Sequence, residues 1–264
     1  MKYVSKVKCS NDIKKDIEKA VLLIGGFPIK KGDVVLLKPN YVVDKPYPVS
    51  TSKDALKAVA ELLYKNGAKK VIIGESSYSN TRKAMENQGA FAAAKETNSD
   101  AIVFDEENWQ ERQINEKTVH IPEVFEHVDK VVFLCNLKTH TDARFTASLK
   151  HSIGCIKLKE RTDHSKMEFF VPEVASLFKP DLCIIDARKV FVTEGPSSGE
   201  IRDPNLILAS KDRIALDVEG LKILKSYEAD NLLEFEPWDF PTIKLAIKLG
   251  LGAKSEKDYE VREE

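Results

Sequence analysis

Short apolar runs alternate with helix-like segments along the chain, and this alternation limits the folds that the chain can adopt. The runs are rich in Val, Ile and Leu without strict alternation, which is typical of strands covered on both faces. They lie at 33–38, 70–74, 101–104, 130–135, 182–186 and 206–210. Helical patterns lie at 12–24, 50–67, 80–88, 212–225 and 241–249. This order predicts an α/β fold with a mostly parallel sheet and helices on both faces.

Length and composition predict a single domain. The chain has 264 residues, of which 42% are hydrophobic and 31% charged, so it can bury a full core. No fixed-period repeat interrupts it, and the loop-like segment 193–205 is too short to separate domains. We therefore expect residues 1–264 to form one α/β domain. The acidic, amide-rich sequence within 105–125 predicts a small excursion at the sheet edge, with a hairpin.

The charge balance excludes some partners. Lys and Arg number 41 against 42 Asp and Glu, so no overall field attracts nucleic acid or an anionic membrane surface. The first residues lack the apolar core of a secretory signal, and the longest apolar run near them is too short to span a bilayer. We expect a cytoplasmic protein without nucleic-acid or membrane partners.

Familiar cofactor and catalytic motifs are absent from the sequence. Its cysteines, Cys9, Cys135, Cys155 and Cys183, lie far apart and form no CxxC pair, so an iron–sulfur cluster within the chain is not expected. There is also no GxxxxGK[ST], GxGxxG, HExxH or GxSxG sequence in a fitting place. The common nucleotide-binding, zinc-protease and serine-hydrolase classes therefore lack support.

Polar residues follow several predicted strands at the point where each apolar run ends. They are Lys38 with Asn40, Glu75, Lys138 with His140, and Asp186. Ligands of open α/β sheets bind beyond the carboxyl ends of the strands, where loops and helix N-termini converge. If these strands are parallel, one edge of the sheet gathers these side chains. A single polar residue after a strand is also typical of a solvated surface, but their joint occurrence favours a functional site.

The segment 135–154, CNLKTHTDARFTASLKHSIG, leaves an apolar run and at once places several polar residues together. From Phe145 onward its spacing predicts a helix. Thr146 and Lys150, four residues apart, would share one side of this helix, and Gly154 would be its C-cap. The sequence therefore brings two polar groups of this segment to one face.

A helix that begins at 141 or 142 would direct free backbone N–H groups toward Lys138 and His140, a place that suits a phosphate or carboxylate. Lysine supplies a positive charge, or a nucleophile when burial lowers its pKa, and histidine passes a proton near neutral pH. The alternative is that Lys138 and Lys150 pair with surface carboxylates and His140 caps a turn. We favour function because the polar run follows directly on a buried strand.

A metal site is a further hypothesis. His164 lies in a polar segment and is most simply a solvated loop histidine, but with His140 and Glu75 it could complete a metal or proton-transfer site. Asp186 could orient a base or hold the metal. A divalent metal is thus a candidate cofactor, with Asp186 and His164 as its candidate ligands.

Several ordered motifs resemble an uncharacterised conserved family, domain of unknown function 362. They are LKPN at 37–40, the segment from Gly67-Ala68 to Gly74-Glu75-Ser76, LKTH at 137–140 with TASLKHSIG at 146–154, VTEGPSSG at 192–199, and SKDRIALD at 210–217. The resemblance extends from about residue 33 to residue 252. The layout, with Lys and His near a sheet end, also has a distant likeness to nickel-dependent lactate racemases, but the motifs do not align well enough to carry residues over.

The residue patterns and the resemblance together give a set of site residues. Catalytic candidates are Lys138, His140, Glu75 and Lys150, and substrate-binding candidates are Lys38, Asn40, Thr146, Gly195, Ser197 and Gly199. The family pattern also singles out Gly154, Asp186, Asp212 and Asp217; the last two serve as helix caps at least as well as catalytic groups. Loop 193–205 suits a binding loop and an ordinary turn equally. Where relatives commonly have Asn, this chain has His151.

Two functions follow from these observations. The first is an enzyme that acts on a small anionic substrate, a carboxylate or phosphate, by Lys/His acid–base chemistry: Lys138 and Lys150 bind the anion, and His140 with Glu75 moves the proton. The alternative is a redox accessory or metal-binding protein that works with a separate ferredoxin. Many relatives carry an appended ferredoxin-like segment with clustered cysteines, and this chain has none.

Overall fold

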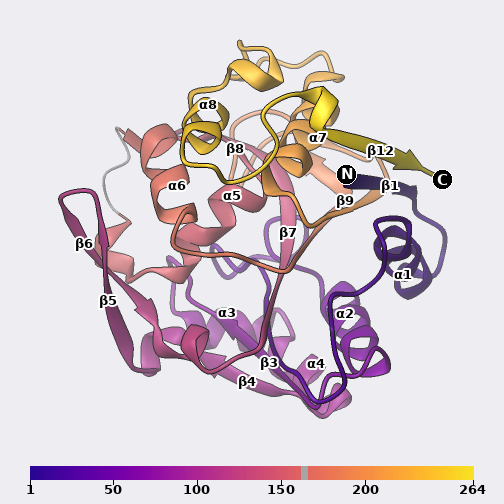
Figure 1. The fold of residues 1–264 in the computed structure, drawn as a ribbon, viewed down its shortest axis with the longest axis vertical. Helices are drawn as coiled ribbons and strands as arrows, with labels where there is room; N and C mark the ends of the chain where they lie inside the picture. Colours follow the sequence, from indigo (N-terminus) through magenta and orange to yellow (C-terminus); the bar gives the residue numbers. More distant parts are fainter. Residues whose placement is uncertain (162–165) are drawn as a thin grey trace.

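The computed structural model describes residues 1–161 and 166–264, and these contain one large mixed sheet (Figure 1). Its strands are β1 (Lys2–Lys8), β2 (Val34–Lys38), β3 (Lys70–Glu75), β4 (Asp100–Val103), β7 (Lys130–His140), β8 (Arg144–Thr146), β9 (Leu182–Phe191), β10 (Ile201–Arg202), β11 (Leu206–Ser210) and β12 (Tyr259–Glu263). The main order is β12-β1-β11-β9-β7-β2-β3-β4, while β8 pairs with β7 and β10 with β9.

The central strands are parallel. β9, β7, β2, β3 and β4 run in one direction, and β11 adds to β9 in the antiparallel sense. β1 is antiparallel to β11, and β12 is parallel to β1. The predicted mostly parallel α/β sheet is confirmed. β7, β2 and β3 are neighbours, so their carboxyl ends meet at one edge.

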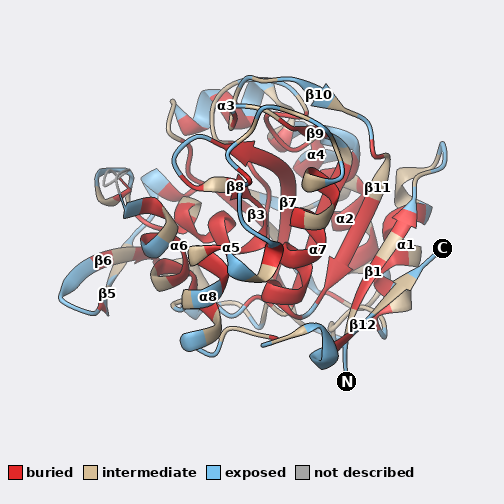
Figure 2. Cartoon of the chain, turned by 90° about the horizontal axis from the view of Figure 1, so that it is seen from above, coloured by how far each residue is buried: buried red, intermediate tan, exposed pale blue. Residues whose placement is uncertain are grey.

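Helices cover both faces of the sheet, as predicted (Figures 1 and 2). They are α1 (Ile13–Leu23), α2 (Lys53–Lys65), α3 (Thr81–Asn87), α4 (Ala90–Thr97), α5 (Ser148–His151), α6 (Met167–Ala175), α7 (Arg213–Lys225) and α8 (Pro241–Lys248). Alternate side chains of β7 enter two separate cores: Leu134 packs with α1–α4, and Phe133 packs with α5–α8. This explains why the central strands read as continuous apolar runs.

Side-chain caps fix the starts of four helices. Ser52 accepts a hydrogen bond from the backbone N–H of Ala55 at the start of α2, and Asp212 does the same for Ala215 at the start of α7. Asp12 and Asn80 cap α1 and α3 in the same way. Each cap satisfies a backbone donor that the helix itself leaves unpaired. The interpretation of Asp212 as an N-cap is therefore confirmed.

The segment after residue 135 differs from its prediction. β7 continues to His140 and forms an antiparallel hairpin with β8, so that Lys138 pairs with Thr146. The helix starts only at Ser148. A helix is present in the predicted stretch, but its predicted start, at Phe145 or at 141–142, is wrong, because a turn with Arg144 at φ 65° returns the chain along β7. Lys138 therefore lies within a strand and not beyond its end. Gly154 is not the C-cap of this helix, because it lies within a short 3-10 helix at Ser152–Cys155.

The predicted edge excursion is a hairpin of β5 (Trp109–Ile114) and β6 (Lys117–Pro122), a separate two-stranded sheet that extends to one side of the molecule (Figure 1). β1, β12, α4 and α6 are further elements that the sequence patterns did not reveal. In the described part of the chain, no helix is long and apolar enough to cross a membrane. The cytoplasmic location stays a prediction.

Candidate functional site

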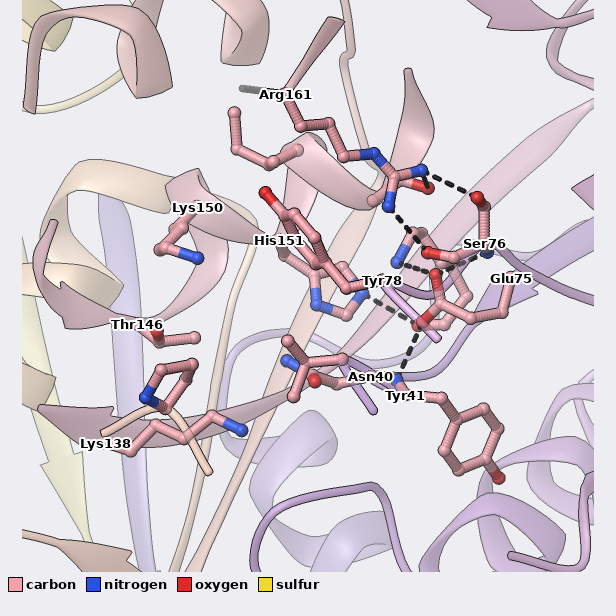
Figure 3. Close-up of a pocket in the computed structure, with 15 residues that line it drawn as sticks. Asn40, Tyr41, Glu75, Ser76, Tyr78, Lys138, Thr146, Lys150, His151 and Arg161 are labelled. Carbon is pink, nitrogen blue, oxygen red and sulfur yellow. Dashed lines mark hydrogen bonds and ion pairs between the residues drawn. The ribbon is translucent and has the colours of Figure 1, made fainter. Parts of the chain in front are cut away.

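A cavity lies where the carboxyl ends of β2, β3 and β7 meet α5 (Figure 3). Its volume is about 40 Å³, enough for about two or three water molecules or one small anion. Its charged lining consists of Lys38, Glu75, Lys138, Lys150 and Arg161. Glu75 is the only carboxylate among the described lining residues, so basic groups outnumber acidic ones.

Lys38 and Glu75 form a buried ion pair across the ends of β2 and β3. Their side chains approach to 2.7 Å, and each is 2% exposed. Glu75 also accepts hydrogen bonds from the backbone N–H groups of Tyr41 (2.9 Å) and Ser76 (2.8 Å). Gly154 lies against this pair, where an added Cβ would come within 2.7 Å of Lys38 Nζ. The pair is therefore fixed in position, and Glu75 offsets one positive charge.

Arg161 is also buried, and the acceptors of its hydrogen bonds among the described residues are neutral. It donates to the backbone carbonyl groups of Ile156 (2.8 Å) and Ser76 (3.0 Å), and to Ser76 Oγ (2.7 Å). Its guanidinium lies over the ring of Tyr78, 5.5 Å from the centroid. The Arg161 charge is thus held at the cavity by dipoles and a π-face.

Lys138 and Lys150 have lowered pKa values. Burial, followed by the nearby Lys150 ammonium, lowers the pKa of Lys138 to about 7. Burial lowers the pKa of Lys150 to about 8, although Asp142 opposes this shift. Lys138 Nζ donates to the Val49 carbonyl at 2.6 Å. Near neutral pH each of these lysines is therefore present partly as the amine and partly as the ammonium, whereas an exposed lysine is almost entirely the ammonium.

Three uncharged polar groups of the lining residues are buried and lack a hydrogen-bond partner in the described part of the chain. They are the Tyr41 hydroxyl, Thr146 Oγ1 on β8 and His151 Nδ1 on α5. Buried polar groups are normally paired, and an orphaned one calls for an explanation. The Tyr41 hydroxyl points away from Thr146, Lys150 and His151 in Figure 3. An occupant of the cavity would satisfy Thr146 Oγ1 and His151 Nδ1.

The structure brings most of the predicted site residues together. Lys38, Asn40, Glu75, Lys138, Thr146 and Lys150 all line the cavity. His140 does not, although it lies two residues from Lys138. It borders a separate hollow with Arg144 and Asp230, and its Nδ1 accepts backbone N–H groups of Asp142 (3.1 Å) and Ala143 (3.2 Å). This is the turn-capping role that the sequence left open.

Loop 193–200 borders the cavity through Pro196. Gly195 has φ 83°, and an added Cβ would meet the carbonyl oxygen of Thr139 at 1.9 Å. Gly199, at φ 128°, is packed as closely against the carbonyl of Thr193. The Ser197 carbonyl accepts a hydrogen bond from Lys45 at 3.1 Å. The glycines and Ser197 therefore hold the loop in place, and their binding role stays a prediction.

The described residues contain no set of side chains arranged as metal ligands. Asp186 is buried, paired with Arg188 at 2.7 Å, and accepts a hydrogen bond from Tyr47 at 2.9 Å. His164 lies outside the described residues. Within 1–161 and 166–264, no three His, Cys, Asp or Glu side chains gather in a way that could hold a metal ion. The redox role with a separate ferredoxin stays a prediction.

Comparison with known families agrees with the motifs. The sequence model of the family described as "Domain of unknown function (DUF362)" matches residues 35–222. The chain belongs to this family. The matched region contains every described charged residue of the cavity, from Lys38 to Arg161. In this DUF362 protein the site is thus part of the family domain itself.

Individual relatives are distant. The "Thylakoid-associated protein sll1697" of Synechocystis sp. is 26% identical over 239 residues, covering 87% of this chain and 71% of that protein. A crystal structure from Thermotoga maritima has a TM-score of 0.48 and 12% identity over 89% of this chain and 58% of that one. The lactate racemase apoprotein of Thermoanaerobacterium thermosaccharolyticum has a TM-score of 0.47 and 12% identity, covering 83% and 56%. The DUF362 chain therefore spans less than three fifths of either solved chain.

Sequence reasoning missed two residues of this DUF362 site. Arg161 gives no signal beyond its place in a polar segment, and His151 stands out only as a departure from the usual Asn. The family pattern does single out Asp217, and the structure shows what this residue holds. Asp217, on α7, accepts hydrogen bonds from the backbone N–H groups of Ser148 (2.8 Å) and Leu149 (3.0 Å) at the start of α5. Burial raises the pKa of Asp217 to about 6. Asp217 therefore positions the helix that carries Lys150 and His151.

Proposed function

We propose that this DUF362 protein is an enzyme that binds a small anion, a carboxylate or phosphate, in the cavity and transfers a proton with its buried lysines. The observation that carries the proposal is the excess of buried positive charge around a space of about 40 Å³. Glu75 offsets Lys38, while Lys138, Lys150 and Arg161 have no carboxylate of their own among the described lining residues. Asp142, outside this lining, offsets part of the Lys150 charge. An anion in this space supplies the missing negative charge.

The two lysines provide complementary roles in proton transfer. With pKa values of about 7 and 8, one lysine can be an amine while the other is an ammonium near neutral pH. The amine of Lys138 accepts a proton from the bound substrate, and the Lys150 ammonium stabilises the negative charge that develops. Proton return from Lys138 restores the starting state. A catalytic pKa near the operating pH is the condition under which such transfer is efficient.

Lys138, and not His140, is the group that accepts the proton in this scheme. Lys138 lines the cavity, whereas His140 borders another hollow and accepts two backbone hydrogen bonds. Glu75 is held by Lys38 and two backbone N–H groups. Its role in this scheme is to fix Lys38 beside the anion.

Binding is the first test. Isothermal titration calorimetry with phosphate and with acetate should detect an ion that binds in the cavity, and native mass spectrometry of the purified protein should show any ion that is retained. Lys138→Met and Lys150→Met should each weaken binding about tenfold or more, the usual effect of losing a charge-assisted hydrogen bond. The exposed Lys179→Met is the control and should bind like the parent protein. Equal affinity in all three variants would refute the site.

Proton transfer needs its own readout. A panel of small carboxylates and phosphate esters is incubated with the protein in D₂O, and the loss of C–H signals is followed by proton NMR. The parent protein should exchange a hydrogen next to the acidic group of its substrate, and Lys138→Met should abolish the exchange while Lys179→Met retains it. Binding without exchange across the panel would remove the enzymatic part of the proposal and leave an anion-binding protein.

A further inference from the structure

The tautomer of His151 is fixed by its surroundings. Its Nε2 lies 3.0 Å from the backbone carbonyl oxygen of Lys38. A carbonyl oxygen only accepts hydrogen bonds, so Nε2 must carry the hydrogen. In the neutral ring, Nδ1 then carries a lone pair and can only accept. Nε2 therefore donates to the protein backbone, and Nδ1 is the nitrogen that can accept a hydrogen bond.

The ring stays neutral and cannot reverse these roles. His151 is 4% exposed, and burial, followed by the Lys38 ammonium, holds its pKa well below the usual value. The ring packs against Phe133, with 4.8 Å between the centroids. A second proton on Nδ1 would add a further charge beside Lys38, Lys138 and Arg213, all of which oppose it. Nδ1 therefore remains an acceptor across the neutral pH range.

His151 Nδ1 is directed toward the cavity. It is buried without a hydrogen-bond partner in the described part of the chain, and the residue lines the cavity. In Figure 3 this nitrogen lies on the side of the ring that faces Thr146 and Lys150, opposite the nitrogen that contacts Lys38. The cations Lys138, Lys150 and Arg161 line the same space. The wall thus combines groups that attract an anion with one acceptor that needs a donor.

We propose that His151 makes the site selective for anions that carry a hydrogen-bond donor of their own, such as hydrogenphosphate or a hydroxycarboxylate. This inference rests on the proposed anion site and specifies its ligand class. The donor hydroxyl of the anion binds His151 Nδ1 while its charged oxygens face the lysines. Thr146 Oγ1 can donate or accept, so it adapts to either kind of ion. An anion without a donor leaves the buried Nδ1 unpaired, or places a lone pair against it.

Two pairs of ions test the selectivity. Phosphate and sulfate are alike in size and shape, but near neutral pH only phosphate keeps a proton. Glycolate and acetate make the same comparison for carboxylates, since only glycolate has a hydroxyl group. Calorimetric titration of the protein at about pH 7.5 should give phosphate at least about tenfold higher affinity than sulfate, and glycolate higher affinity than acetate. The pair that binds more tightly identifies the acid class.

The variant His151→Gln isolates the role of Nδ1. The terminal amide nitrogen of Gln reaches about as far as His Nε2 and can still donate to the Lys38 carbonyl, but no acceptor remains at the position of Nδ1. The preference for phosphate over sulfate should fall to about twofold or less, with sulfate affinity retained. Lys179→Met, far from this ring in sequence and exposed, should keep the preference of the parent protein.

The outcomes separate the two proposals. If none of the four ions binds, the anion site itself is refuted. If the parent protein binds phosphate and sulfate, or glycolate and acetate, with equal affinity, the anion site stands and selectivity by His151 is refuted. A preference that His151→Gln leaves unchanged also refutes the role of His151. Should that variant fail to fold, the comparison of ions in the parent protein still decides whether the site requires a donor.

Discussion

Gly154 lies against the ion pair of Lys38 and Glu75, and there is no room for a side chain at its position. A Cβ at this position would come within 2.7 Å of Lys38 Nζ and 3.0 Å of Glu75 Oε1. Gly154→Ala should therefore displace the pair and lower the free energy of unfolding by about 1–3 kcal/mol, as overpacking of a core does. Urea denaturation measures the loss. A change below about 0.5 kcal/mol would show that the pair can move without cost.

Three charged residues of the site were easier to predict than Arg161 and His151. Lys38, Glu75 and Lys138 end or nearly end neighbouring strands, so the rule that ligands bind at strand ends located them. His140 follows the same rule but lies in another hollow, because the hairpin with β8 turns the chain there. His151 reaches the cavity only through the position of a short helix. Sequence spacing does not encode that position.

The short helix α5 depends on a residue from another helix. Asp217 of α7 accepts the backbone N–H groups of Ser148 and Leu149, and the Ser148 hydroxyl donates to it at 2.5 Å. Asp217→Asn replaces one acceptor oxygen with a donor that faces a backbone N–H. We expect a loss of about 1–3 kcal/mol in the free energy of unfolding and several-fold weaker phosphate binding.

Asp212 provides the matched control for this change. Its Oδ1 caps α7 at Ala215, and its other oxygen pairs with the half-exposed Lys2. Asn is as good an N-cap as Asp, so Asp212→Asn should cost less than about 1 kcal/mol and leave phosphate binding unchanged. Urea denaturation and calorimetry of both variants make the comparison. Equal effects on binding would show that Asp217 does not position the site.

Loop 193–200 is held against β7 by Gly195. A side chain there meets the Thr139 carbonyl at 1.9 Å, and the backbone has φ 83°. Gly195→Ala should force the loop away, weaken phosphate binding by about tenfold or more and destabilise the fold by more than about 2 kcal/mol. Gly32→Ala, at φ 100° with no atom within 4 Å, should cost only the strain of its backbone, about 1–2 kcal/mol, and bind normally. Calorimetry and urea denaturation distinguish the two variants.

At the scale of the whole molecule, the buried lysines should make stability depend on pH. The pKa of Lys138 is about 7 in the folded protein and about 10.4 in an unfolded chain. Between these values the unfolded state binds more protons, so the free energy of unfolding rises with pH, by up to about 1.4 kcal/mol per pH unit for one lysine. Below about pH 7 both states are protonated, and the folded state carries the cost of a buried charge.

Lys138→Met isolates this contribution. Met has a similar length and no charge, so the variant should gain stability relative to the parent protein at about pH 6, and the gain should shrink as the pH rises to about 8.5. The other titrating groups are common to both proteins and largely cancel in the difference. Urea denaturation in a buffer without phosphate at several pH values is the measurement. A pH-independent difference would mean that Lys138 is not buried as a cation.

The fold class could be predicted from the sequence, while the strands at the β12 edge of the sheet could not. The apolar runs of β2, β3, β7 and β9 are covered on both faces, and this gives a strong pattern. β1 and β12 lie at the far edge, where burial alternates or is partial. Their pairing joins the two ends of the described chain, and no local pattern reports such a distant partner. The order of the strands was likewise beyond reach of the sequence.

The deep burial of the cavity lysines has a consequence for timing. Lys38 and Lys138 are 2% and 1% exposed, and the contact of Lys45 with Ser197 joins the loop after β2 to the loop after β9. We predict that these loops separate before an ion reaches the lysines, so that the protein's own opening sets the rate of exchange. The observed association rate in rapid mixing should level off at high ion concentration, and an ion of modest affinity should still have a long residence time.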